Sequence, residues 1–159
     1  MIYTLMVTCT LENVTSFGVN KETYSFAIKV HCANCHEVTP NYLYICVEQF
    51  VSSKKGPGQV NACYKCKLCG TESTISYVPN SLRRIEKEDL DALVSFDFRG
   101  CVPTEFQPSG EWDVSTEGAS VPFQAKFEEI GPCGASWSDY DENNGRSIGI
   151  YDLKTKFYR

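Results

Sequence analysis

The chain has 159 residues, of which 42% are apolar and 13% aromatic, and its net charge at pH 7 is −5. That length suits one domain or two small ones, and the apolar content is sufficient for a hydrophobic core, which argues against a disordered chain. The acidic balance argues against an extended nucleic-acid interface, which normally needs a basic surface. No stretch approaches the roughly eighteen apolar residues of a membrane helix, so we expect no membrane partner.

The first eight residues lack the basic segment and the long apolar segment of a secretory signal. We therefore expect a cytoplasmic protein that can also enter the nucleus. In such a reducing compartment the nine cysteines stay as thiols, and closely spaced pairs among them indicate a metal site rather than disulfides.

The first half of the chain is rich in short segments with apolar and polar residues in alternation or with many β-branched and aromatic residues. Both patterns predict strands. The predicted strands are residues 3–11, 23–31, 42–51, 59–64 and 74–78. Because residues 52–58 are typical of a turn, we expect 42–51 and 59–64 to pair as a hairpin.

Residues 80–91 are dominated by charged side chains and follow Pro79. We interpret them as a solvated connector, with room for one helical turn, between a unit of residues 1–79 and a unit of residues 92–159. The second unit again predicts strands, separated by a long loop over residues 100–119. These strands are residues 94–98, 121–127 and 147–158, with Gly149 as a candidate bulge.

Two segments that lie 97 residues apart have a similar pattern. Residues 26–32 and 123–129 each begin with Phe and carry Lys at the fourth position. No segment sustains a helical apolar stripe. The sequence therefore predicts an all-β fold of two small sandwich-like or barrel-like units related by a degenerate repeat, with a four-cysteine, zinc ribbon-like site in the first.

Two Cys-x-x-Cys pairs, separated by thirty residues, form that site. They are Cys32 with Cys35, and Cys66 with Cys69. Two-residue spacing lets a tight turn direct both sulfurs at one metal, and two such turns complete a tetrahedron. Four thiolates leave no position open for water or substrate. We therefore predict one structural Zn²⁺ per chain and no catalysis at the metal. The predicted hairpin would bring the two pairs together at its open end.

Several alternatives stay open from the spacing alone. Cys63 also forms a Cys-x-x-Cys pair with Cys66, although Gly70 favours the pair that ends at Cys69, because glycine turns freely after it. His31 and His36 flank the first pair, and either can serve as a zinc ligand. Four reduced cysteines without metal are the remaining interpretation.

Taken together, several motifs resemble the eukaryotic CXXC-motif-containing zinc-binding proteins over nearly the whole chain. Besides the two pairs, they are residues 10–15, 65–69, 98–100, 106–108, 137–142 and 149–151. The resemblance implies zinc held by the four cysteines, two β units, no assigned enzymatic activity and a link to a metallochaperone-type partner. The departures are Cys101, where the family usually has an apolar residue, and His36, where it usually has glycine.

We expect a zinc-stabilised, non-catalytic, monomeric module that binds another protein through its second half. The loop of residues 99–108 and the segment 137–142 are the candidate surface. Its candidate anchors and acids are Trp112, Trp137, Tyr140, Asp139, Asp141 and Glu142. These acids favour a basic partner. The pair Asp139 and Asp141 is also a candidate second metal site or acid–base pair.

Two other functions are weighed against this one. A thiol redox enzyme would use Cys101 or Cys133 as its nucleophile, which requires an electropositive neighbourhood. A nucleic-acid-associated zinc ribbon would use the lysines near the site, which are Lys54, Lys55, Lys65 and Lys67. A zinc ion with four thiolates carries a charge of −2, however, so these lysines already have a local charge to balance.

Overall fold

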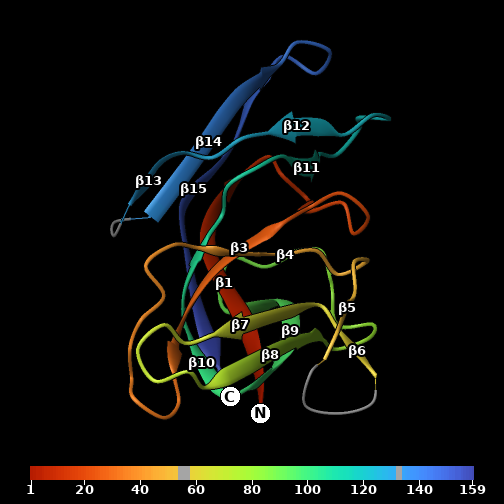
Figure 1. Ribbon diagram of the computed structural model, residues 1–159. Coiled ribbons are helices and arrows are strands. Elements are labelled where there is room, and N and C mark those ends of the chain that lie inside the picture. Colours follow the sequence, from red (N-terminus) through yellow and green to blue (C-terminus); the bar gives the residue numbers. More distant parts are fainter. Residues whose placement is uncertain (54–57, 132–133) are drawn as a thin grey trace.

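Antiparallel strands make up the computed structural model, which describes residues 1–53, 58–131 and 134–159 (Figure 1). The described residues contain fifteen strands and no helix, which confirms the all-β prediction. The strands are β1 (Ile2–Glu12), β2 (Ser16–Gly18), β3 (Phe26–Cys32), β4 (Leu43–Ile45), β5 (Val51–Ser52), β6 (Gln59–Val60), β7 (Ala62–Lys65), β8 (Glu72–Tyr77), β9 (Asp91–Arg99), β10 (Cys101–Gln107), β11 (Trp112–Ser115), β12 (Phe123–Ala125), β13 (Glu128–Gly131), β14 (Gly134–Asp141) and β15 (Arg146–Tyr158). Lys54, Lys55 and Cys133 lie outside the described residues. The described part contains no helix that could cross a membrane.

The largest sheet has seven strands in the order β13-β14-β15-β1-β9-β8-β7. Its central strand, β1, has the burial pattern that its sequence predicts: Leu5 and Val7 are fully buried, whereas Thr4, Met6 and Thr8, which alternate with them, are only partly buried. This alternation is the period of two that a strand with one buried face requires. The long strands β1, β9 and β15 therefore supply one wall of the core.

Two three-stranded sheets, β10-β3-β4 and β12-β11-β2, cover that core. Aromatic rings join the layers: Phe26 of β3 meets Phe96 of β9 with ring centroids 5.5 Å apart. Within the sheet β12-β11-β2, the ring centroid of Trp112 lies 5.9 Å from that of Phe17, and 5.4 Å from that of Phe127, which follows β12. Such rings contribute large buried areas and edge-to-face contacts, and they hold the sheets together without regular hydrogen bonds between layers.

The predicted hairpin of residues 42–51 and 59–64 is wrong in its pairing. β4 pairs with β3, β7 pairs with β8, and only the two-residue strands β5 and β6 pair with each other. The physical reason is the apolar face of β3, against which the short β4 segment buries Ile45.

The bulge that was predicted at Gly149 is also wrong. Gly149 pairs regularly with Glu12, and the irregularity in β15 lies instead near Asp152, whose φ is 53°.

The division at residues 79 and 91 stays a prediction, as does the repeat. Strands from both predicted units hydrogen-bond within the seven-stranded sheet, where β1 lies between β9 and β15. The connector contains no helical turn, and its Ile85 is fully buried and hydrogen-bonded through its backbone to Phe17. Charged side chains flank Ile85, so this segment is solvated on one side and packed on the other.

Candidate metal centre

The two Cys-x-x-Cys turns have the same backbone hydrogen bonds. In the first turn the His36 N–H donates to the Cys32 carbonyl over 2.9 Å, and in the second the Gly70 N–H donates to the Cys66 carbonyl over 2.9 Å. The N–H of the first cysteine of each turn donates in the opposite direction, to the carbonyl five residues later. The two turns are therefore equivalent in conformation as well as in sequence spacing.

His36 occupies the position that Gly70 occupies in the second turn. Their φ angles are 65° and 77°, both in the left-handed region. Glycine adopts this conformation freely, whereas a side chain there costs about 1–3 kcal/mol. The first turn therefore keeps its geometry despite a residue that does not favour it, and the strain is offset elsewhere in the fold.

The corner between β9 and β10 brings the two turns together. β9 pairs with β8, which leaves the second turn, and β10 pairs with β3, which enters the first turn, with Cys101 opposite Cys32. At the corner itself the Gly100 carbonyl accepts a hydrogen bond from the Ala33 N–H over 3.0 Å. The cluster is therefore positioned by strand pairing across two sheets and not by a single hairpin.

Gly100→Ala is expected to destabilise the protein by about 2–4 kcal/mol and to weaken zinc retention. The φ of Gly100 is 82°, and a Cβ at this position would lie 2.7 Å from the Glu72 carbonyl oxygen and 3.0 Å from Ser73 Oγ. Denaturant unfolding with metal analysis measures both effects. Gly118→Ala is the matched control, because its φ is also 82° but its Cβ would meet only the Asn144 side chain, at 3.4 Å. Equal losses for the two variants would contradict a special role for the corner.

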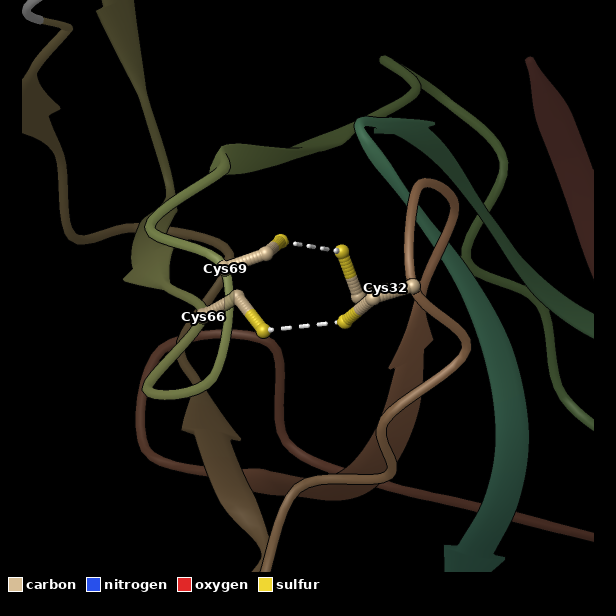
Figure 2. A group of neighbouring side chains, drawn as sticks. Cys32, Cys66 and Cys69 are labelled. Atoms are coloured by element: carbon tan, nitrogen blue, oxygen red, sulfur yellow. Dashed lines mark hydrogen bonds between the residues drawn. The ribbon is translucent and has the colours of Figure 1, made fainter.

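The four predicted sulfurs converge on one point (Figure 2). Cys32 Sγ lies 3.6 Å from Cys69 Sγ, Cys35 Sγ lies 3.5 Å from Cys66 Sγ, and all four sulfurs lie within 4.8 Å of one another. A tetrahedron with zinc–sulfur bonds of about 2.3 Å has sulfur–sulfur distances of about 3.8 Å. Four soft thiolates at this spacing suit Zn²⁺. Within the described part of the chain this is the only group of such ligands that could hold a metal ion.

Polar groups gather around the Cys69 sulfur. It lies 3.1 Å from the Thr71 hydroxyl and 3.6 Å from the Asn34 side-chain amide. The Thr71 hydroxyl, the Thr71 N–H and the Asn34 amide together lower the pKa of Cys69 to about 5. This sulfur is therefore held as a thiolate, the form that binds metal.

The two cysteines of the first turn, Cys32 and Cys35, differ in the direction in which their pKa values are shifted. The backbone N–H groups of Cys35 and Asn34 lower the pKa of Cys32 and outweigh burial. The N–H of Glu37 favours ionisation of Cys35, but burial and the three other sulfurs raise its pKa to about 12. Four thiols this close do not all ionise without a cation, so metal binding releases protons.

The alternative ligands lie outside the cluster. Cys63 is exposed on β7, with its sulfur 3.9 Å from the Ser52 carbonyl oxygen. His31 and His36 lie against each other with ring centroids 5.6 Å apart, and neither belongs to the group of converging ligands. The structure thus selects the Cys66–Cys69 pair over the Cys63–Cys66 pair.

Of the two candidate nucleophiles, only Cys101 lies within the described residues. Cys101 is 4% exposed, and burial raises the pKa of its thiol to about 11, although Ser73 donates a hydrogen bond that acts the other way. Asp139 is exposed, whereas Asp141 is buried and accepts hydrogen bonds from Asn144. The two acids therefore lie in different environments, and Asp141 already has a structural partner.

Sequence reasoning missed three residues of this site. Thr71 and Asn34 contact the Cys69 sulfur, and Gly100 sets the corner that joins the turns. A threonine and an asparagine next to cysteines are too common to signal a contact. Gly100 follows the predicted strand of residues 94–98, but residues 100–119 were expected to be a loop, and that expectation was wrong because β10 and β11 lie within them.

Known proteins with the same fold and motifs support this assignment. A family model described as CXXC motif containing zinc binding protein, eukaryotic, matches residues 4–158. The CXXC motif containing zinc binding proteins of Xenopus laevis and Homo sapiens are 33% and 32% identical, each over 98% of this chain and 96% of its own length. The crystal structure of C1orf123 superposes with a TM-score of 0.88 and 29% identity over 100% of this chain and 99% of that one. A hypothetical protein from Plasmodium falciparum has the same fold, with a TM-score of 0.81, 18% identity and 99% coverage of both chains. The chain therefore belongs to the eukaryotic family of CXXC motif containing zinc binding proteins.

Proposed function

We propose that the protein is a zinc-stabilised, non-catalytic module that binds another protein. The observation that carries this proposal is the closed cluster: four protein sulfurs within 4.8 Å of one another fill every position of a tetrahedral zinc ion. One zinc ion per chain then links the end of β3 to the β7–β8 turn. Such a site contributes to folding and holds loops rigid, and rigid scaffolds present binding residues on other segments.

The same geometry supports a function without turnover. A catalytic zinc site keeps one position for water or substrate, and four thiolates occupy all of them. The buried Cys101 thiol has a raised pKa, which disfavours the thiolate that a redox enzyme needs. Burial of Cys101 also keeps it away from a substrate in solution. These observations support binding rather than chemistry as the function.

The candidate anchors on the second half differ strongly in exposure. Trp112 is 1% exposed and Trp137 is 9% exposed, so the expectation that they are interface anchors is wrong. Tyr140 is 53% exposed, and its neighbours Asp139 and Glu142 are exposed as well. Asp141 points inward and orders the turn through Asn144, with Arg146 3.8 Å away. We define the exposed trio Asp139, Tyr140 and Glu142 as the hairpin surface.

The hairpin surface suits a basic protein partner. It lies at the β14–β15 turn, which Figure 1 places at the opposite end of the molecule from β7 and β8. Tyr140 is a residue type common at hot spots, and the exposed carboxylates of Asp139 and Glu142, close to it in the sequence, add charge that steers a basic partner. The family resemblance points to a metallochaperone-type protein as the kind of partner. We propose a monomeric protein in the cytoplasm or nucleus, without a nucleic-acid partner.

A variant with Tyr140→Ala and Asp139→Ala is expected to lose the partner. Loss of the Tyr140 ring, as an anchor that contributes about 1 kcal/mol, weakens binding roughly fivefold. Loss of the Asp139 charge lowers the rate of association further. The measurement is quantitative mass spectrometry of proteins captured from cell extract by zinc-loaded protein. We expect capture to fall at least fivefold while zinc content and unfolding midpoint stay unchanged.

Tyr44→Ala is the matched control, because Tyr44 is 66% exposed and lies on β4 in the first half. It should capture the same partner as the wild type. Rising salt should weaken capture by the wild type, since the interaction is partly electrostatic. Identical capture by the double variant and the wild type would rule out the hairpin surface.

A further inference from the structure

The four cysteines of the cluster differ in their access to solvent. Cys32 and Cys66 are 4% and 3% exposed, Cys35 is intermediate, and Cys69 is exposed. The residues beside Cys69, Leu68 and Gly70, are exposed too. Cys69 is therefore the most exposed cysteine of the cluster and the one most open to a small reagent from solution.

The Cys69 sulfur also has a near neighbour across the cluster. Cys32 Sγ lies 3.6 Å away, on the other turn (Figure 2). Cys35 and Cys66 form the second close pair, at 3.5 Å, and this pair likewise joins the two turns. The four sulfurs thus divide into two close pairs that each cross from one turn to the other, and only the Cys32–Cys69 pair contains an exposed member.

We infer that the cluster is an oxidation-sensitive switch, in which a hydroperoxide reacts at Cys69 and the resulting Cys32–Cys69 disulfide releases the zinc. This inference rests on the proposed structural role of the metal and adds its regulation. The co-reactant is a small hydroperoxide, of which hydrogen peroxide is the probe.

The chemistry proceeds in two balanced steps. The Cys69 thiolate attacks one oxygen of hydrogen peroxide, the O–O bond breaks, a sulfenic acid forms and hydroxide leaves. The Cys32 thiolate then attacks the Cys69 sulfur, the S–S bond forms and a second hydroxide leaves. Two thiolates have lost two electrons in total, and the peroxide has become two hydroxide ions, which take up protons from solvent.

The disulfide joins the same two turns that the metal joins. With two of the four thiolates consumed, the remaining Cys35 and Cys66 cannot close a tetrahedral site, and the zinc ion leaves. The chain still has a covalent link between the end of β3 and the β7–β8 turn. The oxidised protein therefore keeps these turns connected, in contrast to a protein stripped of zinc by a chelator.

Two hydrogen-bond donors slow the reaction of the Cys69 sulfur with peroxide. The Thr71 hydroxyl, at 3.1 Å, and the Asn34 amide, at 3.6 Å, draw electron density from the sulfur and lower its nucleophilicity. Thr71→Val removes one donor and leaves the backbone of the turn intact. We expect this variant to release zinc roughly three- to tenfold faster under peroxide, the rate effect of one hydrogen bond.

The test follows zinc release and disulfide formation together in purified, zinc-loaded protein. A chromogenic chelator records the zinc released by hydrogen peroxide, and trypsin followed by mass spectrometry maps the first disulfide. Trypsin separates Cys66, in residues 66–67, from Cys69, in residues 68–83, and leaves Cys32 in residues 30–54. We expect one zinc ion released per disulfide, with residues 68–83 linked to residues 30–54 and fragment ions that locate the bond at Cys32.

Two variants serve as controls. Thr74→Val makes the same change on β8, outside the set of groups that contact the sulfurs, and should release zinc at the wild-type rate. Cys63→Ser removes the exposed thiol that lies outside the cluster and should leave both the rate and the disulfide unchanged. An effect of Cys63→Ser on the rate would place the first reaction at Cys63 and overturn the inference.

A first disulfide within one turn, or between Cys35 and Cys66, would also overturn the inference, as would a Thr71→Val rate equal to that of Thr74→Val. These results would leave the structural role of zinc untouched. That role fails instead if the protein freed of zinc by a chelator unfolds at the same denaturant concentration as the zinc-loaded protein.

Discussion

Cys66→Ser is expected to leave the purified protein without zinc and to lower its free energy of unfolding by more than about 4 kcal/mol. Cys66 is 3% exposed, and its sulfur lies 3.5 Å from Cys35 Sγ, within the cluster of four sulfurs. A serine hydroxyl is a poor zinc ligand, and without the metal the two turns lose their link. Elemental analysis and denaturant unfolding measure the two losses, and soluble yield should fall with them.

Cys63→Ser is the control for this prediction. Cys63 lies three residues before Cys66, is exposed on β7 and contributes no sulfur to the cluster. The variant should keep one zinc ion per chain and change the free energy of unfolding by no more than about 0.5 kcal/mol, as is usual for a surface substitution. A full zinc complement in Cys66→Ser, or zinc loss in Cys63→Ser, would contradict the ligand assignment.

Trp112→Ala should cost about 3–5 kcal/mol of stability, the usual effect of truncating a large buried side chain. Trp112 is 1% exposed, and its ring centroid lies 5.5 Å from that of Tyr24 and 5.4 Å from that of Phe127. Removing the indole leaves a cavity among these rings that the surrounding sheets cannot fill. Denaturant unfolding at 25 °C measures the effect.

The folded fraction of Trp112→Ala should still bind one zinc ion, because the ring contacts of Trp112 lie in the core and not at the cluster. Tyr140→Ala is the control: Tyr140 is 53% exposed, and its loss should change stability by no more than about 0.5 kcal/mol. A cost below about 1 kcal/mol for Trp112→Ala would show that Trp112 is not a core residue and would restore it as a surface candidate.

Several strands were predictable because their side chains follow a local rule. In β1 the buried Leu5 and Val7 and the less buried threonines match the alternation of the sequence, and most of β9 follows in the same way. Pairing was not predictable for short strands. β4 and β7 carry too few residues to specify a partner, and they pair with β3 and β8 because those strands already expose free edges beside them.

Exposure was the least predictable property of the candidate site. The sequence of residues 137–142 contains two aromatic residues and three acids without a sign of which point inward. The structure buries Trp137 and Asp141 and exposes Tyr140, because β14 alternates its faces and the turn that follows needs an acceptor for Asn144. The partner surface therefore shrinks from the whole segment to the hairpin surface.

The sequence by itself determined the composition of the metal centre. Cys32, Cys35, Cys66 and Cys69 could be named from the two-residue spacing together with Gly70, which favours Cys69 over the alternative Cys63. A two-residue interval is a local constraint that any fold must satisfy in order to aim two sulfurs at one ion. Only the tertiary structure decided how the two turns meet, through the Gly100 corner between two sheets, and which of the four cysteines is exposed. Both properties depend on contacts between segments far apart in the chain, and the free energies of such contacts leave no periodic mark on either segment.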